Sequence, residues 1–140
     1  MPSVTPTIVL LDGQVEMVLG SPMGTMIISA VLHAITNVID FEMNAEQAVQ
    51  TPRFHHQWKP ATLFLEPEFV SDVKSTLEAW GHSLGTRQIM GAAELIVFDR
   101  KNCYYRGGAD GRRDSGALAA NLALDATPGK QRAACLAGKQ

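Results

Sequence analysis

Apolar residues in the first third of the chain change from strand-like runs to a helical period. Residues 7–11 and 15–19 are β-prone runs that flank Asp12-Gly13, a pair typical of tight hairpin turns, so they predict a β-hairpin. From Met26 onward, apolar residues recur at steps of three and four, which predicts a helix. Further apolar residues outside the main stripe indicate a helix that is covered on more than one side. The stripe contains Ile28, Val31, Leu32, Ile35 and Ile39.

The middle of the chain predicts shorter elements. Asn44 and Gln47 have the spacing of a helix capping box, and Pro52 is expected to end that short helix. Residues 51–60 then form a loop or an extended segment, and residues 62–66 form a short strand. Beyond them, apolar side chains at helical spacing predict a helix closed by a glycine; they are Val70, Val73, Leu77 and Trp80, before Gly81.

Two further strands, residues 92–98 and 103–105, predict a second hairpin. The order of elements is then two strands, two helices, a strand, a helix and two strands. Hairpins on either side of helices favour an α+β domain in which helices layer on one face of an antiparallel sheet. The other face of that sheet needs a cover. Residues 117–140, rich in alanine and glycine, are expected to form a loosely ordered tail.

Composition narrows the class of protein. The 140 residues are 46% hydrophobic and carry a formal charge of −2, which fits one globular domain with its own core. The basic residues are scattered, which argues against a nucleic-acid partner. The longest apolar stretch, residues 26–35, is far shorter than the roughly 20 residues that a membrane-spanning helix needs, so we expect no membrane span. The N-terminus lacks the pattern of a secretion signal, and the sequence leaves the compartment open.

The sequence GSPMGT, residues 20–25, connects a predicted strand to the helix predicted from Met26. Backbone amides at such a junction form a donor-rich, partly positive site for an anion or for developing negative charge. A nucleotide-binding P-loop is excluded because Met26 stands where that motif requires lysine. The residues alone leave two interpretations open, a plain strand-to-helix connection and an amide cradle.

Other polar residues give weaker signals. The adjacent His55 and His56 would point in different directions on an extended chain, and no further ligand spacing supports them, so we expect no metal site. Ser21 lies outside any GxSxG motif, which leaves a serine nucleophile unsupported. Four charged residues favour an ion-paired surface loop of little energetic weight over a catalytic site: Asp110, Arg112, Arg113 and Asp114.

Three stretches together resemble the C-terminal part of the small subunit of γ-glutamyltranspeptidases, also called glutathione hydrolases. They are TPTIVLLDGQVEMVLGSPMGT, IDFEMNAEQAVQTPRFHHQW and MGAAELIVFDRKNCYYRGGADGRRDSG, in that order along the chain. The resemblance covers residues 3–116, and PRFHHQW together with the GSPxG loop is its most specific part. It predicts that residues 1–116 form this region of the small subunit.

The resemblance implies an N-terminal-nucleophile hydrolase fold, an αββα sandwich assembled from a large and a small subunit that self-cleavage releases from one precursor. It also implies transfer of a γ-glutamyl group from glutathione or a related compound to water or to an amino acid. In the family, a threonine at the new N-terminus of the small subunit is the nucleophile, and its own α-amine is the base. No metal or other cofactor is implied.

The resemblance also suggests roles for particular positions. The family's oxyanion-hole glycine pair falls on Met23 and Gly24, and the Ser-Ser pair that holds the substrate α-carboxylate falls on Pro2 and Ser3. Only Ser3 keeps a hydroxyl. Met23 departs from the family pattern, and glycine is favoured where the backbone takes a positive φ or approaches a ligand closely. A methionine there either holds its amide in place with strain or turns it away.

The family's nucleophilic threonine belongs to a segment outside these 140 residues, because Thr5, Thr7 and Thr25 do not match its position. We therefore expect the isolated chain to be inactive, and to depend on the large subunit and on the missing segment of the small subunit. One alternative is a non-catalytic interaction module that retains half of the fold. Another is a small anion-binding domain unrelated to glutamyl transfer.

Overall fold

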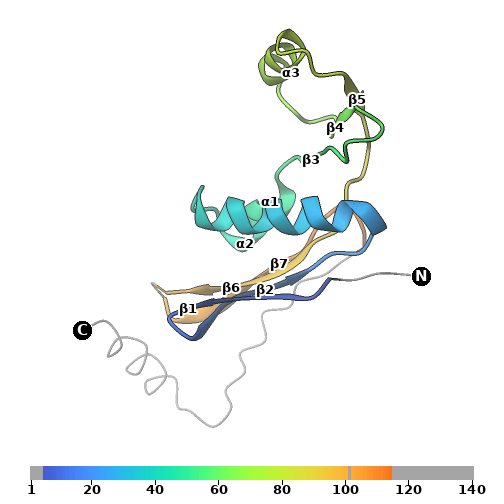
Figure 1. The fold of residues 1–140 in the computed structure, drawn as a ribbon. Coiled ribbons are helices and arrows are strands. Elements are labelled where there is room, and N and C mark those ends of the chain that lie inside the picture. Colours follow the sequence, from blue (N-terminus) through green and yellow to red (C-terminus); the bar gives the residue numbers. More distant parts are fainter. Residues whose placement is uncertain (1–4, 101, 115–140) are drawn as a thin grey trace.

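The structure is a computed structural model that describes residues 5–100 and 102–114. Its main sheet has four antiparallel strands in the order β1-β2-β6-β7, and the helices α1 and α2 lie on one face of it (Figure 1). The strands are β1 (Thr7–Leu11), β2 (Gln14–Gly20), β6 (Glu94–Asp99) and β7 (Tyr104–Gly108). The expected α+β arrangement, with helices on one face of an antiparallel sheet, is confirmed.

The first hairpin forms where the sequence predicts it. Asp12 and Gly13, between β1 and β2, have φ angles of 53° and 76°. Positive φ at both central residues is typical of the tight turns whose twist matches the flanking strands. The second predicted hairpin is also present, as β6 and β7. At the other end of β2, Gly20 pairs with Glu94, so β2 ends where β6 begins.

Two helices follow the first hairpin. A short 3₁₀ turn, η1 (Gly24–Met26), leads into α1 (Ile27–Ile39), and α2 (Ala45–Gln50) comes next. The predicted capping box is confirmed: the Gln47 amide donates to Asn44 Oδ1 at 2.9 Å, and the Asn44 amide donates to Gln47 Oε1 at 3.1 Å. Two of the amide donors that a helix start leaves unpaired are thereby satisfied.

The core lies between the main sheet and the two helices. Burial of a methionine or leucine side chain stabilises the fold by about 1.5–3 kcal/mol. The backbones also approach closely, since a Cβ on Gly108 would lie 2.3 Å from the Ala45 carbonyl oxygen. Glycine is therefore required where β7 passes under α2. The buried cluster comprises Met17, Leu19, Ile27, Val31, Ala34, Ala45, Ala48, Val49, Ala93 and Leu95.

The helix α1 buries a different face from the one that its apolar spacing suggests. Ile28 is 76% exposed and Leu32 is 54% exposed, and Ile39 is exposed as well. Only Val31 of the predicted stripe is buried, although Ile35 packs partly against the core. The expectation of cover on more than one side is met in part, because Ser29 and His33 of α1 contact His55 and Phe54 on a second side. The physical reason for the choice of buried face is size: the face rich in alanine lets α1 lie close to the sheet, and the bulkier residues face away. The buried face carries Ile27, Ala30, Val31, Ala34 and Asn37.

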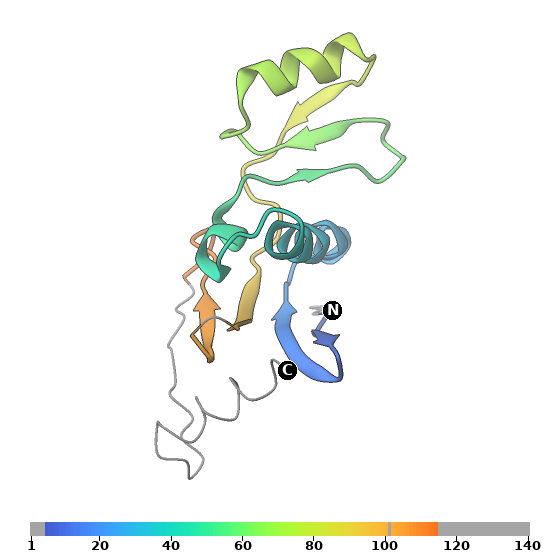
Figure 2. The ribbon, with the colours of Figure 1, turned by 90° about the vertical axis from the view of Figure 1, so that its left-hand side faces the viewer.

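A second, smaller sheet lies beyond α1 on the side away from the main sheet (Figure 2). It contains β3 (Phe54–His55), β4 (Leu63–Leu65) and β5 (Leu84–Thr86), and α3 (Ser71–Ala79) precedes β5. The predicted strand at 62–66 and the helix before Gly81 are confirmed. The sequence gives no sign of β3 or β5, or of the parallel pairing between β4 and β5. Strands of two or three residues are too short to show alternation.

The outer face of the main sheet is apolar and exposed. Ile8, Val18 and Ile96 lie in one row across β1, β2 and β6, and all three are exposed. Within the described residues nothing covers this row, in line with the expectation that this face needs a cover. No helix among the described residues is both long and apolar enough to cross a membrane. The tail expected at residues 117–140 lies outside the described residues.

His33 on α1 provides a test of the packing between α1 and the smaller sheet. Its ring lies 4.2 Å from that of Phe54, centroid to centroid. Burial lowers the pKa of His33 from 6.5 to about 4, and the nearby Arg53 contributes to the decrease. Between these pH values the unfolded chain binds this proton and the folded chain does not. The free energy of unfolding is therefore expected to fall as pH decreases from about 6.5 to 4, by at most ~1.4 kcal/mol per pH unit.

Urea unfolding between pH 4.5 and 7.5, compared with His33→Gln, measures this effect. The difference in stability between the two proteins is expected to be constant near neutral pH and to shift against the wild type as the pH falls. If the stability of the two proteins changed in parallel over the whole pH range, His33 would have the same pKa in the folded and unfolded states.

Candidate functional site

The loop that joins β2 to α1 has an unusual backbone. Met23 has φ 101° and ψ 47°, and Gly24 has φ 56°. The Met26 amide donates to the Met23 carbonyl at 3.2 Å, which closes η1. A positive φ at a residue other than glycine costs of order 1–3 kcal/mol. Of the two outcomes expected for Met23, the structure shows the strained backbone.

The amides of Met23 and Gly24 are consecutive donors at the surface. Met23 is partly buried and Gly24 is exposed. Within residues 5–100 and 102–114, neither amide donates a hydrogen bond to the protein. Successive backbone amides in such a turn form a concavity that suits an anionic oxygen. Both amides are therefore available to an acceptor from outside the described residues.

A network of four charged side chains lies behind this loop. Arg53 Nη1 lies 2.7 Å from Asp110 Oδ2, and Arg112 Nη1 lies 3.0 Å from Asp110 Oδ1. Arg112 also pairs with Glu66, with Nη2 at 2.5 Å from Oε2. Arg53, Glu66 and Asp110 are each at most 1% exposed. The two positive and two negative charges balance, and such balance is necessary because an unpaired buried charge costs several kcal/mol.

The network also holds four backbone segments. Both arginines donate to the Val49 carbonyl at the end of α2, at 2.9 Å from Arg53 and 2.8 Å from Arg112. Glu66 accepts the Met90 amide at 3.1 Å, and Asp110 accepts the Ala93 amide at 2.8 Å. The segment that leads into β6 is thus fixed to α2, to the end of β4 and to the residues after β7.

The charged segment 110–114 behaves differently from the surface loop that the sequence suggests. Asp110 and Arg112 do form an ion pair, but Asp110 is fully buried. Burial alone would raise the pKa of Asp110; Arg53 and the hydrogen bonds from Ala93 and Arg112 hold it below its usual value. The expectation of a surface position is therefore wrong for Asp110, whereas Arg113 and Asp114 are exposed as expected.

The histidines do not converge. His55 is buried, with Nδ1 at 2.7 Å from Ser29 Oγ and Nε2 at 3.2 Å from Gln57 Oε1. His56 points elsewhere and accepts the Trp58 amide on Nδ1 at 3.2 Å. The part of the chain that the structure describes contains no cluster of three or more His, Cys, Asp and Glu side chains able to hold a metal ion.

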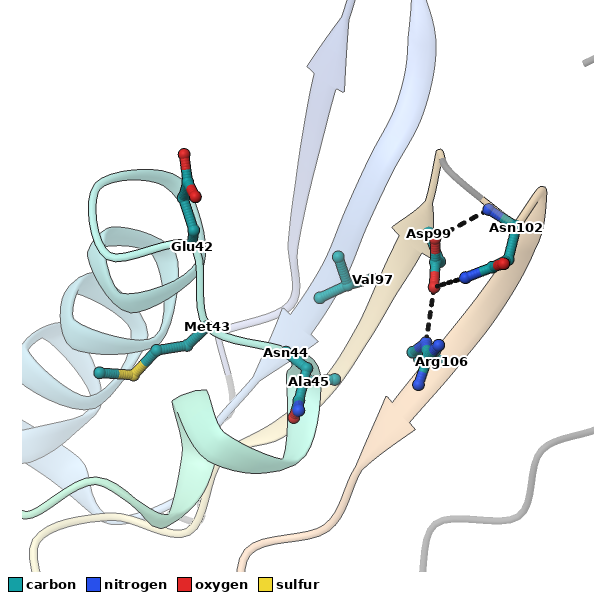
Figure 3. A pocket seen from close by; sticks show the side chains of 8 residues that line it. All are labelled: Glu42, Met43, Asn44, Ala45, Val97, Asp99, Asn102 and Arg106. Atoms are coloured by element: carbon teal, nitrogen blue, oxygen red, sulfur yellow. Dashed lines mark hydrogen bonds and ion pairs between the residues drawn. The ribbon is translucent and has the colours of Figure 1, made fainter. Parts of the chain in front are cut away.

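A surface pocket of about 420 Å³ lies at the far end of the main sheet from the loop. Asp99, at the end of β6, lines it and binds Asn102 and Arg106 (Figure 3). Glu94, at the opposite end of β6, is the residue beside Gly20 and the loop. The pocket and the loop are therefore separate features.

Sequence reasoning missed Arg53 and Glu66. Their partners Asp110 and Arg112 are distant in the sequence, so no local spacing connects them. The one weak signal is that each adjoins a short strand, since Arg53 precedes β3 and Glu66 follows β4. Ser3, the expected carboxylate-binding residue, lies outside the described residues, as does Pro2.

Comparison with known proteins gives consistent matches. Residues 1–120 match the family model described as Gamma-glutamyltranspeptidase. The glutathione hydrolase proenzyme of Escherichia coli (strain K12) is 42% identical over 95 residues, which are 68% of this chain and 16% of that protein. A second relative, from Pseudomonas sp. (strain A14), is 38% identical and matches 81% of this chain and 21% of its own length. The chain spans about a fifth of these curated relatives.

Solved structures agree. A crystal structure of a gamma-glutamyltranspeptidase mutant from Helicobacter pylori has a TM-score of 0.75 and 40% identity, covering 81% of this chain and 62% of that one. Cephalosporin acylase from Bacillus halodurans has a TM-score of 0.73 at 23% identity, which shows a shared fold alone, over 81% of this chain and 22% of that chain. The chain has part of an N-terminal-nucleophile hydrolase fold, as expected.

The strain at Met23 predicts a reversed order of stability for two variants. At ordinary positions, alanine is more stable than glycine by about 0.4–1 kcal/mol, because glycine loses more backbone freedom on folding. At a positive φ the order should reverse, so Met23→Gly is expected to be more stable than Met23→Ala by about 1 kcal/mol. Both variants lose the same side-chain contacts, and chemical denaturation measures the difference. An alanine variant that is the more stable would contradict the positive φ.

The buried network predicts a large effect of removing one carboxylate. Asp110→Ala leaves Arg53 buried without its partner and is expected to destabilise the chain by about 3–5 kcal/mol. The matched control is Glu16→Ala, which removes a carboxylate that pairs with the exposed Arg100 at the surface, where solvent weakens the interaction. Urea unfolding measures the loss of stability in each variant. Equal losses would show that burial does not make removal of the Asp110 carboxylate more destabilising.

Proposed function

The chain belongs to the gamma-glutamyltranspeptidase family, and from this premise we propose that it supplies the oxyanion loop of an enzyme that transfers γ-glutamyl groups. The proposed substrates are glutathione and related γ-glutamyl compounds, with water or an amino acid as acceptor. Residues 1–116 would form the C-terminal part of the small subunit. The observation that carries this proposal is the pair of consecutive amides at Met23 and Gly24, in the GSPxG loop at the end of β2.

The proposed chemistry places negative charge at this loop. A threonine hydroxyl from another segment attacks the γ-carbonyl carbon, and its proton passes to the threonine's own α-amine. The carbonyl oxygen becomes an oxyanion, which accepts hydrogen bonds from the Met23 and Gly24 amides. The C–N bond then breaks, the leaving amine takes the proton, and the acyl-enzyme ester is resolved by water or by an amino acid. Preorganised donors of this kind are each worth about 10²–10³ in rate.

Ser3 would bind the substrate in the same site. By its position in the family pattern, its hydroxyl would donate to the α-carboxylate of the γ-glutamyl group, as one of the Ser-Ser pair. Pro2 at the other position has no hydroxyl to offer, so substrate affinity would depend more heavily on Ser3 and on groups from other segments.

The proposed enzyme needs further polypeptide. We propose that the nucleophilic threonine comes from another segment of the small subunit, and that this segment and a large subunit complete the site. Two exposed apolar surfaces support this: the row of Ile8, Val18 and Ile96 on the main sheet, and the outer side of α1 around Ile28 and Leu32. Contiguous exposed apolar surfaces are typical of sites where another polypeptide binds.

The same surfaces favour a second candidate function, a non-catalytic interaction module. In that case the chain would keep half of the fold and bind a partner through the outer face of the main sheet, without any role for the Met23-Gly24 amides. Activity of an assembled enzyme distinguishes the two candidates.

A chimera provides the test. The matching region of the Escherichia coli relative is replaced by residues 1–120 of this chain, and release of p-nitroaniline from a γ-glutamyl anilide is measured. The chimera is expected to be active and the 140-residue chain alone inactive. As a control, glycolic acid in place of Gly24 turns its amide into an ester, which removes one N–H donor without changing the positive φ, and it is expected to lower kcat by about 10²–10³. A folded but inactive chimera would favour the interaction module, and turnover by the chain alone would refute the need for a missing nucleophile.

A further inference from the structure

We propose that Ser21 is the positioning residue of the oxyanion loop, fixing the direction of the Met23 and Gly24 amides through hydrogen bonds of its side chain. The inference rests on the proposed function. Ser21 itself touches no reacting atom and is not the nucleophile, since its hydroxyl is fully buried within the protein.

Both hydrogen bonds of Ser21 join the loop to its surroundings. The Ser21 hydroxyl donates to the Pro22 carbonyl at 3.0 Å, inside the loop. The same oxygen accepts the Ala92 amide at 3.2 Å, from the segment just before β6. The Pro22 carbonyl belongs to the peptide group whose N–H is the Met23 amide. A bond to that carbonyl therefore sets the orientation of the first proposed oxyanion donor directly.

Packing around Ser21 leaves little room for the loop to move. Gly91 has φ +82°, and a Cβ at this position would lie 2.8 Å from Ser21 Oγ and 2.7 Å from Ala30 Cβ. Glycine is therefore required at 91, since any side chain would push either Ser21 or α1 away. The oxyanion loop therefore packs directly against the backbone of Gly91, with no side chain in between.

The segment that holds Ser21 is itself held by the buried network. Ala92 lies between Met90 and Ala93, whose amides bond to Glu66 and Asp110 respectively. Arg53 also donates to the Met90 carbonyl at 3.2 Å. A continuous series of bonds thus runs from the charged network through residues 90–93 to Ser21, and from Ser21 to the peptide group that carries the Met23 amide.

The kinetic test uses the active chimera. In Ser21→Ala, the Met23 amide loses its fixed direction while substrate-binding groups stay in place, so kcat is expected to fall about 10- to 100-fold with KM changed less than twofold. Ser21→Cys keeps a group that accepts hydrogen bonds only weakly, and its kcat is expected to lie between those of the wild type and Ser21→Ala. The matched control Ser29→Ala removes a hydroxyl of α1 that bonds to His55 of β3, outside the loop. It is expected to leave kcat within twofold.

A second measurement does not depend on activity. The ¹⁵N heteronuclear NOE of Met23 and Gly24, measured on the 140-residue chain, reports backbone motion on the picosecond to nanosecond timescale. It is expected to fall in Ser21→Ala and to remain unchanged in Ser29→Ala. Unchanged values in Ser21→Ala, or equal losses in both variants, would overturn the positioning role. An inactive chimera with the expected NOE changes would instead count against the proposed function alone.

Discussion

The fold depends on the pairing of four charges, the buried Arg53, Glu66 and Asp110 and the partly buried Arg112. These residues adjoin β3, β4 and β7, so the network lies where the main sheet, the smaller sheet and α2 meet. Each carboxylate also accepts backbone amides of the segment entering β6. Charges buried in this way cost several kcal/mol unless every partner is present, so the network specifies one arrangement of these segments and penalises others.

The regular elements were predictable because each depends on local chemistry. Asp12-Gly13 supplies the positive φ values that a tight hairpin needs, and the Asn44 capping box satisfies amides within its own first turn. The failures have a tertiary origin. The close approach of the main sheet decides which face of α1 is buried. The face that carries alanines is buried, whereas Ile28 and Leu32 are exposed. The strands β3 and β5 exist because β4 lies between them, which no local period reveals.

The candidate site also has one part that local sequence predicts and another that it does not. The position of the loop at Met23 and Gly24 could be predicted from the GSPMGT sequence between a strand and a helix, and its strained backbone was one of two expected outcomes. What holds the loop could not be predicted. Ser21 bonds to Ala92, 71 positions away, and Arg53 pairs with a carboxylate beyond β7. Such pairings follow from the complete fold, and a lone charged or hydroxyl residue in the sequence gives no indication of its partner.

The central claim is that the amides of Met23 and Gly24 face the oxygen on which negative charge develops. A crystal structure of the active chimera, bound to a γ-glutamyl analogue with a boronic acid in place of the scissile amide, tests this directly, because the tetrahedral boronate mimics the intermediate. The account predicts one boronate oxygen at about 2.7–3.1 Å from both amide nitrogens. A boronate whose oxygens are bound by other donors, with both nitrogens beyond about 3.5 Å, would contradict it.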